Sequence, residues 1–170
     1  MTGTFGDNIA INHTGTVEQI LAQLASENPH VDFSNPFTTG VTTGVVEDSH
    51  ISKRVHSDVN CIPVLGQTWK PAKMSAIEDG INFLNHVQAM CRVASHSCAR
   101  VSCSFNSGIH LCNNNDYSLV KSCVDIATYA QAISDKCRYW ITYLNIGETG
   151  GQAWDTENFN ICVYSERCAA

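Results

Sequence analysis

The placement of cysteine is the feature of this sequence that most restricts what the chain can fold into. All nine cysteines lie in the last 110 residues, at positions 61, 91, 98, 103, 112, 123, 137, 162 and 168. They form no paired Cys-x-x-Cys knuckles of the kind that hold zinc, and such a set is typical of a disulfide framework made in an oxidising compartment. Reduced core cysteines and a metal cluster are the alternatives. The sequence therefore predicts a secreted, disulfide-bonded domain over residues 55–170.

An odd number of cysteines leaves one without an intramolecular partner. We expect this to be Cys162, as a buried and inert thiol, because it lies between Ile161 and Val163 where a β-branched residue would serve equally well. The other eight are assigned to four disulfides: Cys61, Cys91, Cys98, Cys103, Cys112, Cys123, Cys137 and Cys168. Cys123 and Cys137 stand about 21 Å apart on one predicted helix, so each must reach a strand or a loop.

Residues 1–54 differ from the rest in charge as well as in cysteine content. They hold 2 basic and 6 acidic residues, whereas residues 55–170 hold 8 and 10. The dibasic pair Lys53-Arg54 stands at this boundary. We therefore expect a precursor that is cleaved after Arg54, with residues 1–54 as a pro-segment; the alternative is two solvated charges in a linker. Asn12-His13-Thr14 is the one N-glycosylation sequon, and it permits secretion.

The pro-segment contains one amphipathic helix. Thr16 and Gln19 form a capping box at its start. Its apolar face consists of Val17, Ile20, Leu21 and Leu24. One such helix cannot fold alone, so this face must rest on the C-terminal domain or the segment stays mobile.

Two further helices are predicted in the C-terminal domain. Ser75 and Glu78 form a capping box ahead of an apolar series at three- and four-residue steps: Ile77, Ile81, Leu84, Val87 and Cys91. The second helix begins near Ser122, which can cap it together with Asp125. Its buried face is Cys123, Ile126, Ala127, Ala130, Ile133 and Cys137.

Alternating apolar residues predict strands around these helices. One set occupies odd positions on both sides of a bend at Asn106-Ser107-Gly108: Val101, Cys103, Phe105, Ile109 and Leu111. Residues 139–146 are β-branched and aromatic, residues 147–151 read as a turn, and Phe159, Ile161 and Val163 alternate again. The predicted fold class is α+β: an antiparallel sheet with two helices packed on it as an α/β sandwich, disulfide-rich and preceded by a pro-segment.

Composition and charge exclude several function classes. With a net charge of −6 and no basic stripe, the chain does not suit nucleic-acid binding. No apolar run reaches the roughly 18 residues of a membrane helix, so stable membrane insertion is not expected. His96 lies between two cysteines that are expected to be in disulfides and so cannot bind a metal as thiolates, and no metal site is predicted. Residues 147–151 lack the Gly-Lys-Ser ending of a phosphate-binding loop, and no cofactor is predicted.

A small hydrolase is the alternative to a binding function. His110 lies on the polar face of a predicted strand, and Asp116 or Asp155 is a conceivable partner in space. A histidine and a carboxylate can act as general acid and base in a ribonuclease-like site. No second histidine or lysine lies at a spacing that would indicate a second acid–base group beside His110. We therefore expect His110 to be a surface or hydrogen-bonded residue and the protein not to be an enzyme.

Loops held by disulfides are the expected binding surfaces, because rigid loops bind without a large ordering cost. The candidate binding residues are His96, Asn114, Asp116, Glu148 and Trp154. The expected partner is a protein or membrane protein on a host or competitor cell, bound by a monomer. For each loop singly, an ordinary turn is the alternative.

Four segments of the domain resemble small secreted fungal cysteine-rich proteins. These segments are residues 101–115 (VSCSFNSGIHLCNNN), 122–130 (SCVDIATYA), 150–155 (GGQAWD) and 158–161 (NFNI). Such proteins in turn resemble the killer toxins of fungi and their cellular relatives. The resemblance implies a disulfide-tied α/β sandwich that acts outside the producing cell as a toxin or effector, in some cases by blocking calcium uptake. The sequence departs from the toxin pattern at Lys70 and in its odd cysteine count, and no functional residue of the toxins is carried over.

Overall fold

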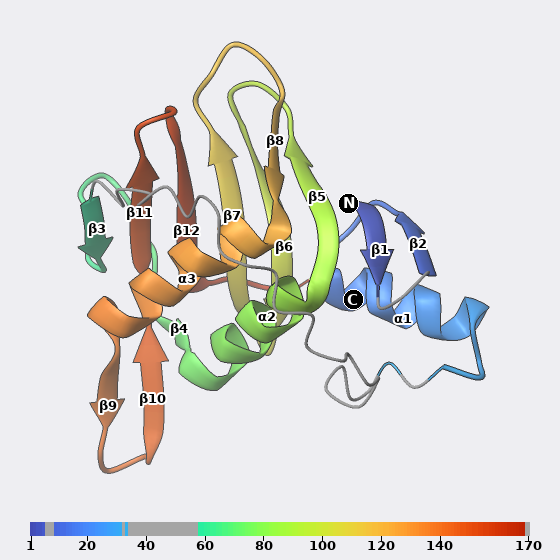
Figure 1. The fold of residues 1–170 in the computed structure, drawn as a ribbon. Coiled ribbons are helices and arrows are strands. Elements are labelled where there is room, and N and C mark those ends of the chain that lie inside the picture. The colour runs from blue at the N-terminus through green and yellow to red at the C-terminus, as the bar shows by residue number, and fades with distance from the viewer. Residues whose placement is uncertain (6–8, 32, 34–57, 169–170) are drawn as a thin grey trace, which may run out of the picture.

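Three helices pack against antiparallel sheets in the computed structural model, which describes residues 1–5, 9–31, 33 and 58–168 (Figure 1). The α+β, disulfide-rich class predicted from the sequence is therefore confirmed. Lys53 and Arg54 lie outside the described residues, so cleavage after Arg54 stays a prediction.

The largest sheet has five strands, each antiparallel to its neighbours, in the order β3-β11-β12-β7-β6. They are β3 (Asp58–Cys61), β11 (Gly151–Asp155), β12 (Phe159–Ser165), β7 (Ser107–Asn113) and β6 (Ser97–Ser104). Because alternate residues of a strand point to opposite faces, the apolar set on one face forms the core: Ile109, Leu111, Ala153, Ile161 and Val163. The opposite face carries polar residues and cysteines, including Cys98, Cys112 and Cys162.

Helices α2 (Met74–His86) and α3 (Cys123–Cys137) pack against each other and cover the buried face of this sheet (Figure 1). The face of α3 expected from its periodicity is buried in full, and Ile126 is 1% exposed. The predicted start of α3 near Ser122 is confirmed, but the capping interactions predicted for both helices are wrong. Lys73, not Ser75, is the N-cap residue of α2, and Ser122 occupies the N-cap position of α3 without a side-chain capping hydrogen bond.

The α2 helix ends earlier than its apolar series indicated. Val87 and Cys91 belong to strand β5 (Val87–Val93), in which buried and exposed residues alternate strictly. This strand pairs with β1 on one side and β8 on the other. Positions 87 and 91 fit both a helical step of four and a strand period of two, and the two neighbouring strands decide between them.

The turn regions also differ from the expectation. Phe105 is not a core residue: its side chain is 75% exposed, and it forms the β6–β7 turn together with Asn106, both with positive φ. Strand pairing extends up to both residues that flank this turn, which leaves only two residues for the hairpin loop. Residues 147–151 are not a turn either, since Gly147 belongs to strand β10 and Gly151 to strand β11.

Two smaller sheets flank the large one. A four-stranded sheet has the order β2 (Ile9–Asn12), β1 (Thr2–Phe5), β5 and β8 (Leu119–Ser122). A three-stranded sheet has the order β4 (Ala72–Lys73), β10 (Ile146–Thr149) and β9 (Tyr139–Ile141). Strands β9 and β10 form a hairpin that projects away from the body of the protein (Figure 1).

Four disulfides are present, and they use the eight cysteines assigned to disulfides from the sequence. Cys61–Cys137 joins β3 to the end of α3, and Cys91–Cys123 joins β5 to its start. Both cysteines of α3 therefore reach strands, as helix geometry required. The other two pairs are Cys98–Cys112 and Cys103–Cys168, and Cys162 is a buried free thiol.

The N-terminal segment packs into the same core. In α1 (Val17–Glu27) the expected capping box of Thr16 and Gln19 is present and the expected apolar face is buried. The Glu18 carboxylate accepts hydrogen bonds from the hydroxyl of Ser102 and the backbone N–H of Cys103, both on β6. Strand β1 adds to the edge of β5. Residues of this segment therefore complete a sheet and cover part of the core.

We expect cleavage after Arg54 to leave the N-terminal segment bound without a covalent link. Among its described residues, six apolar side chains are buried, and they are worth on the order of 10 kcal/mol before the ordering cost is subtracted: Ile11, Val17, Ile20, Leu21, Leu24 and Phe33. After digestion with a dibasic-specific protease, intact mass should show a fragment beginning at Val55, while native size exclusion should show one species.

An Arg54→Ala variant that resists the protease is the control for this cut. Separation of the two fragments in native buffer would show that the buried face of α1 does not hold the segment. Resistance of the parent protein to the protease would instead contradict the precursor hypothesis.

Candidate binding surface

Two of the loops expected to bind a partner, those of His96 and of Asn114 and Asp116, meet at one end of the sheets. His96 Nε2 lies 2.6 Å from Asp116 Oδ1, and both side chains are exposed. The backbones of Asn114 and Asn158 are joined by a hydrogen bond of 3.1 Å, and Asn158 Nδ2 also donates to the Asn114 carbonyl. The structure thus brings the turns after β5, β7 and β11 together, and it places three of the predicted residues there.

The other two predicted residues lie elsewhere. Trp154 is half-buried on β11, on the face of the five-stranded sheet that points away from α2 and α3. Glu148 lies on β10, in the projecting hairpin at the opposite end of the protein from the loop cluster (Figure 1). The five predicted residues therefore do not form one site.

The hairpin carries a concentration of exposed apolar side chains that was not expected from the sequence. Among the described residues, eleven large hydrophobic side chains are exposed, and five of them lie between positions 139 and 146. We call these five the hairpin surface: Tyr139 (47% exposed), Trp140 (53%), Tyr143 (84%), Leu144 (51%) and Ile146 (37%). Clustered exposed apolar residues of this kind mark interaction sites in soluble proteins.

The hairpin is held firmly at its base and at its tip. Its first strand begins two residues after Cys137, which is bonded to Cys61 on β3. Strand β10 pairs with β4 on one side and β9 on the other. At the tip, the N–H of Leu144 donates to the carbonyl of Ile141, and Asn145 adopts a left-handed conformation with φ of 53°. These contacts fix the backbone of the hairpin in the free protein.

A close contact within the hairpin sets the position of Trp140. This residue lies directly opposite Gly147, and a Cβ atom at Gly147 would stand 2.8 Å from the indole ring and 2.7 Å from the methyl group of Met74. Only glycine leaves room for the ring to lie across the strand. The indole therefore lies against the backbone of Gly147, and about half of its surface stays exposed.

Polar contacts continue the hairpin surface toward the β6–β7 turn. The Tyr139 hydroxyl donates to Glu148, and burial, followed by that hydrogen bond and the charge of Glu148, raises the pKa of Tyr139 to about 12. Glu148 lies opposite Lys73 in the sheet, and the Lys73 ammonium lies 5.1 Å from the centre of the exposed Phe105 ring. The surface therefore combines aromatic rings with one charge of each sign.

His110 has a different carboxylate partner from the two expected. Its Nε2 lies 2.8 Å from Glu166 Oε1, whereas Asp116 contacts His96 and Asp155 accepts a hydrogen bond from the Tyr129 hydroxyl. Glu166 follows the end of β12 and reaches back over Gly108, where a Cβ atom would lie 2.4 Å from its carboxylate. The sequence did not predict the contact between Glu166 and His110, because that contact depends on how β12 pairs with β7.

The His110 ring is enclosed rather than presented to solvent. It stacks on Tyr164 with ring centres 4.5 Å apart, and Tyr164 stacks on Trp69 at 4.7 Å. Its side chain is 7% exposed, and Nδ1 is buried without a hydrogen-bond partner. Burial lowers the pKa of His110, and this effect outweighs the attraction of Glu166, while Arg100 adds to the lowering. The neutral ring packs against Tyr164, and little of its surface is accessible to a substrate.

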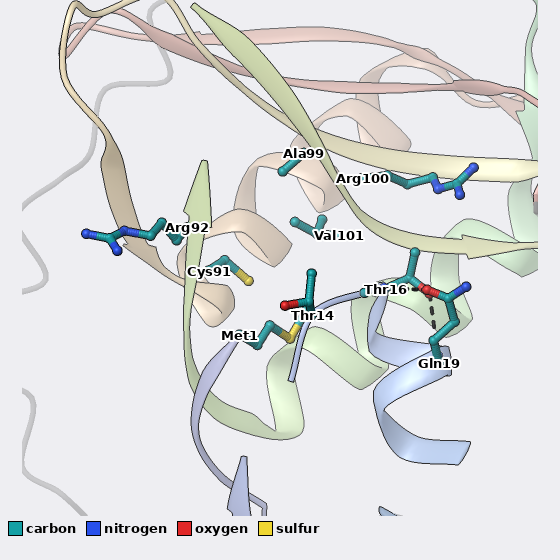
Figure 2. Close-up of a pocket in the computed structure, with 10 residues that line it drawn as sticks. Met1, Thr14, Thr16, Gln19, Cys91, Arg92, Ala99, Arg100 and Val101 are labelled. Carbon is teal, nitrogen blue, oxygen red and sulfur yellow. Dashed lines mark hydrogen bonds between the residues drawn. The ribbon is translucent and has the colours of Figure 1, made fainter. Parts of the chain in front are cut away.

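A cavity of about 270 Å³ lies where the N-terminal segment meets β5 and β6 (Figure 2). Met1, Thr14 and Thr16 line one side, and Cys91 and Val101 line the other. The guanidinium groups of the two lining arginines point away from its centre (Figure 2). The side chains that face the cavity are therefore uncharged, and they include no set suited to acid–base chemistry.

No metal site or membrane helix is found in the described part of the chain. Among these residues, no three histidine, cysteine or acidic side chains gather in a way that could bind a metal ion. No helix among them has the length and apolar character needed to cross a membrane.

Comparison with family models, curated proteins and solved structures found no match to this chain. The resemblance to killer-toxin-like proteins therefore stays a prediction. The sequence analysis did not predict the hairpin surface, although residues 139–144 contain a signal for it. Large side chains follow one another there without the polar residues that alternate with them on a half-buried strand.

We expect His110 to make the protein less stable as the pH falls. Its pKa is lowered in the folded state, so the unfolded chain binds the proton more readily, and stability is lost from about pH 6.5 downward. The loss is at most about 1.4 kcal/mol per pH unit for one proton. The groups that face the ring are Glu166, Arg100, Tyr164 and Cys162.

Urea unfolding at several pH values between 7 and 5 measures this effect. His110→Gln should flatten the pH dependence, since glutamine does not titrate. His86→Gln, at an exposed position on α2, is the matched control. An unchanged pH dependence in His110→Gln would show that this ring does not titrate on unfolding.

Proposed function

We propose that the protein is a secreted toxin or effector that acts on another cell by binding a protein target through the hairpin surface. The observation that carries the proposal is the gathering of five exposed large apolar side chains on one projecting, braced hairpin. Tyrosine and tryptophan are enriched among the residues that dominate the energy of protein interfaces. The resemblance of residues 101–161 to fungal killer-toxin-like proteins supports the same class.

Preorganisation supports a binding role for this hairpin. Ordering a flexible loop costs free energy that is subtracted from the affinity. Here the Cys61–Cys137 disulfide and the pairing of β10 with β4 already fix the hairpin backbone, and the close approach of Trp140 to Gly147 restricts the indole ring. Lys73 and Glu148 at the edge of the surface can add polar contacts that select one partner over another.

A protein target fits this surface better than a lipid bilayer does. The acidic Glu148 lies at its edge, next to Tyr139, and binding to anionic lipid surfaces relies instead on clustered lysine and arginine. A partner with an apolar cleft can enclose Tyr143 and Leu144 at the tip while Tyr139 and Trp140 contact its rim. Such an interface needs no catalytic group, which agrees with the non-enzymatic function proposed.

A small hydrolase centred on His110 is the second candidate, since His110 and Glu166 form a histidine–carboxylate pair. The enclosure of the ring under Tyr164 weighs against it. A screen against RNA, polysaccharide and peptide substrates tests this alternative. Turnover that is abolished in His110→Ala would replace the non-enzymatic proposal.

Two features support secretion. Four disulfides are compatible with an extracellular protein and are rare in reducing compartments. In addition, Asn12 and Thr14 of the sequon are both exposed, and Asn12 ends the edge strand β2. This strand lies on the far side of the protein from the β9–β10 hairpin (Figure 1). A glycan there would leave the hairpin surface free.

We expect Asn12 to carry an N-glycan when the protein passes through a eukaryotic secretory pathway. Treatment with an N-glycosidase should reduce the mass of the secreted protein, and Asn12→Gln and Thr14→Ala should each abolish the shift. Asn85→Gln, at an exposed helical asparagine outside any sequon, should keep it. Secretion of unmodified protein would contradict this prediction.

We expect the double variant Tyr143→Ala/Leu144→Ser to lose target binding without loss of stability, because both side chains project from the hairpin tip. A central anchor of an interface is worth about 2 kcal/mol, so affinity should fall by roughly 30-fold or more. The measurement is capture of a membrane protein from candidate cells by immobilised protein, followed by titration with the purified partner.

Tyr117→Ala is the matched control, since this tyrosine is 61% exposed on a different loop. Equal capture by the parent and the double variant would place the interface elsewhere. Equally tight binding to protein-free lipid vesicles would contradict a protein target.

A further inference from the structure

Three sulfur atoms lie together on the outer face of the five-stranded sheet. Cys98 on β6 and Cys112 on β7 are direct cross-strand partners and are bonded. Cys162 lies on β12, the other neighbour of β7, two residues along from the position opposite Cys112. Its Sγ atom is 4.0 Å from that of Cys112. The free thiol of the odd cysteine is therefore placed against a disulfide.

The three cysteines differ sharply in exposure. Cys162 is 1% exposed and Cys112 is 8% exposed, whereas Cys98 is open to solvent. The free sulfur of Cys162 is thus enclosed in the sheet, whereas the Cys98 end of the neighbouring disulfide can be reached from solvent.

Two amide side chains surround the buried thiol. The Cys162 thiol donates to Asn160 Oδ1 at 3.0 Å, and Gln152 Nε2 donates to the Cys162 sulfur at 3.8 Å. The Gln152 amide also donates to Asn160 Oδ1 at 3.0 Å, which fixes both groups. Gln152 is therefore in place to stabilise a negative charge on the Cys162 sulfur when the thiol ionises.

We propose that these cysteines form a thiol–disulfide exchange site in which Cys162 displaces Cys98 from Cys112, and that the exposed Cys98 thiol then reacts with small disulfides such as glutathione disulfide. In the first step the Cys162 thiol loses its proton and its sulfur attacks Cys112 Sγ. The Cys162–Cys112 bond forms, the Cys98–Cys112 bond breaks, and Cys98 leaves as a thiolate that takes up a proton. No electrons enter or leave the protein in this step.

The second step modifies the surface of the protein. The Cys98 thiolate attacks one sulfur of the small disulfide, a mixed disulfide forms at Cys98, and the other half leaves as a thiol. The first step requires the two buried sulfurs to approach by about 2 Å, from 4.0 Å to the length of a disulfide bond. Burial raises the pKa of Cys162 to about 12, so the exchange is slow at neutral pH and speeds up about tenfold per pH unit.

Alkylation of the native protein tests the exchange. The oxidised protein is incubated with iodoacetamide at pH 7, 8 and 9, quenched in acid, and digested with pepsin without reduction. Mass spectrometry should find the label on Cys98 together with a Cys112–Cys162 disulfide, and the rate should rise about tenfold per pH unit. With glutathione disulfide in place of iodoacetamide, Cys98 should carry glutathione.

Two variants separate this exchange from general disulfide scrambling. Cys162→Ser removes the nucleophile and keeps the Cys98–Cys112 bond, so Cys98 should stay unlabelled. Cys98→Ser leaves Cys112 and Cys162 as thiols, and glutathione disulfide should oxidise them to a disulfide. Thermal unfolding shows whether each variant has folded. If a variant has not folded, the labelling pattern of the parent protein tests the proposal by itself.

Three results would overturn the proposal. One is label on Cys162 with the Cys98–Cys112 bond intact, which would show that the buried thiol opens to solvent without exchange. Another is equal labelling of Cys98 in the parent and in Cys162→Ser. The third is a folded parent protein in which Cys98 stays unlabelled at pH 9.

Discussion

Helix α3 is fastened at both ends, and the rest of the structure depends on this double attachment. Cys123 ties its start to β5 in the four-stranded sheet, and Cys137 ties its end to β3 in the five-stranded sheet. Each bond is worth about 2–4 kcal/mol, chiefly through restriction of the unfolded chain. Between them, Ile126, Ala130 and Ile133 are fully buried against the strands. The helix thereby holds two separate sheets in one core.

The hairpin surface follows from the same attachment. The chain leaves α3 directly after Cys137, so the disulfide that ends the helix also fixes the start of β9. Aromatic side chains on a free hairpin would collapse onto the nearest apolar surface or raise the risk of aggregation. Here Trp140 lies against Gly147, while Tyr143 stays exposed at the tip. A rigid support therefore keeps apolar groups exposed, which is the arrangement that a binding surface needs.

The opposite side of the protein is completed by the N-terminal segment. Strand β1 covers the edge of β5, α1 covers part of the core, and Glu18 satisfies the hydroxyl of Ser102 and the N–H of Cys103 on β6. Removal of such a segment would expose a strand edge and leave polar groups of β6 without their partner. A precursor cut after Arg54 would therefore carry its first segment as a second, noncovalent chain.

The sequence by itself determined the features that depend on neighbouring residues or on counting. Periodicity identified the buried faces of α1 and α3, the Thr16–Gln19 box marked the start of α1, and helix geometry required Cys123 and Cys137 to bond elsewhere. The odd count required one free cysteine, and the prediction that it is Cys162 was confirmed, although five of the bonded cysteines also lie in strands. Only the tertiary structure decided that Val87 and Cys91 lie in a strand, that Glu166 contacts His110, and that the aromatic residues after α3 are exposed. Each of these depends on which distant strands pair, and a local pattern that fits two alternatives carries no information about that pairing.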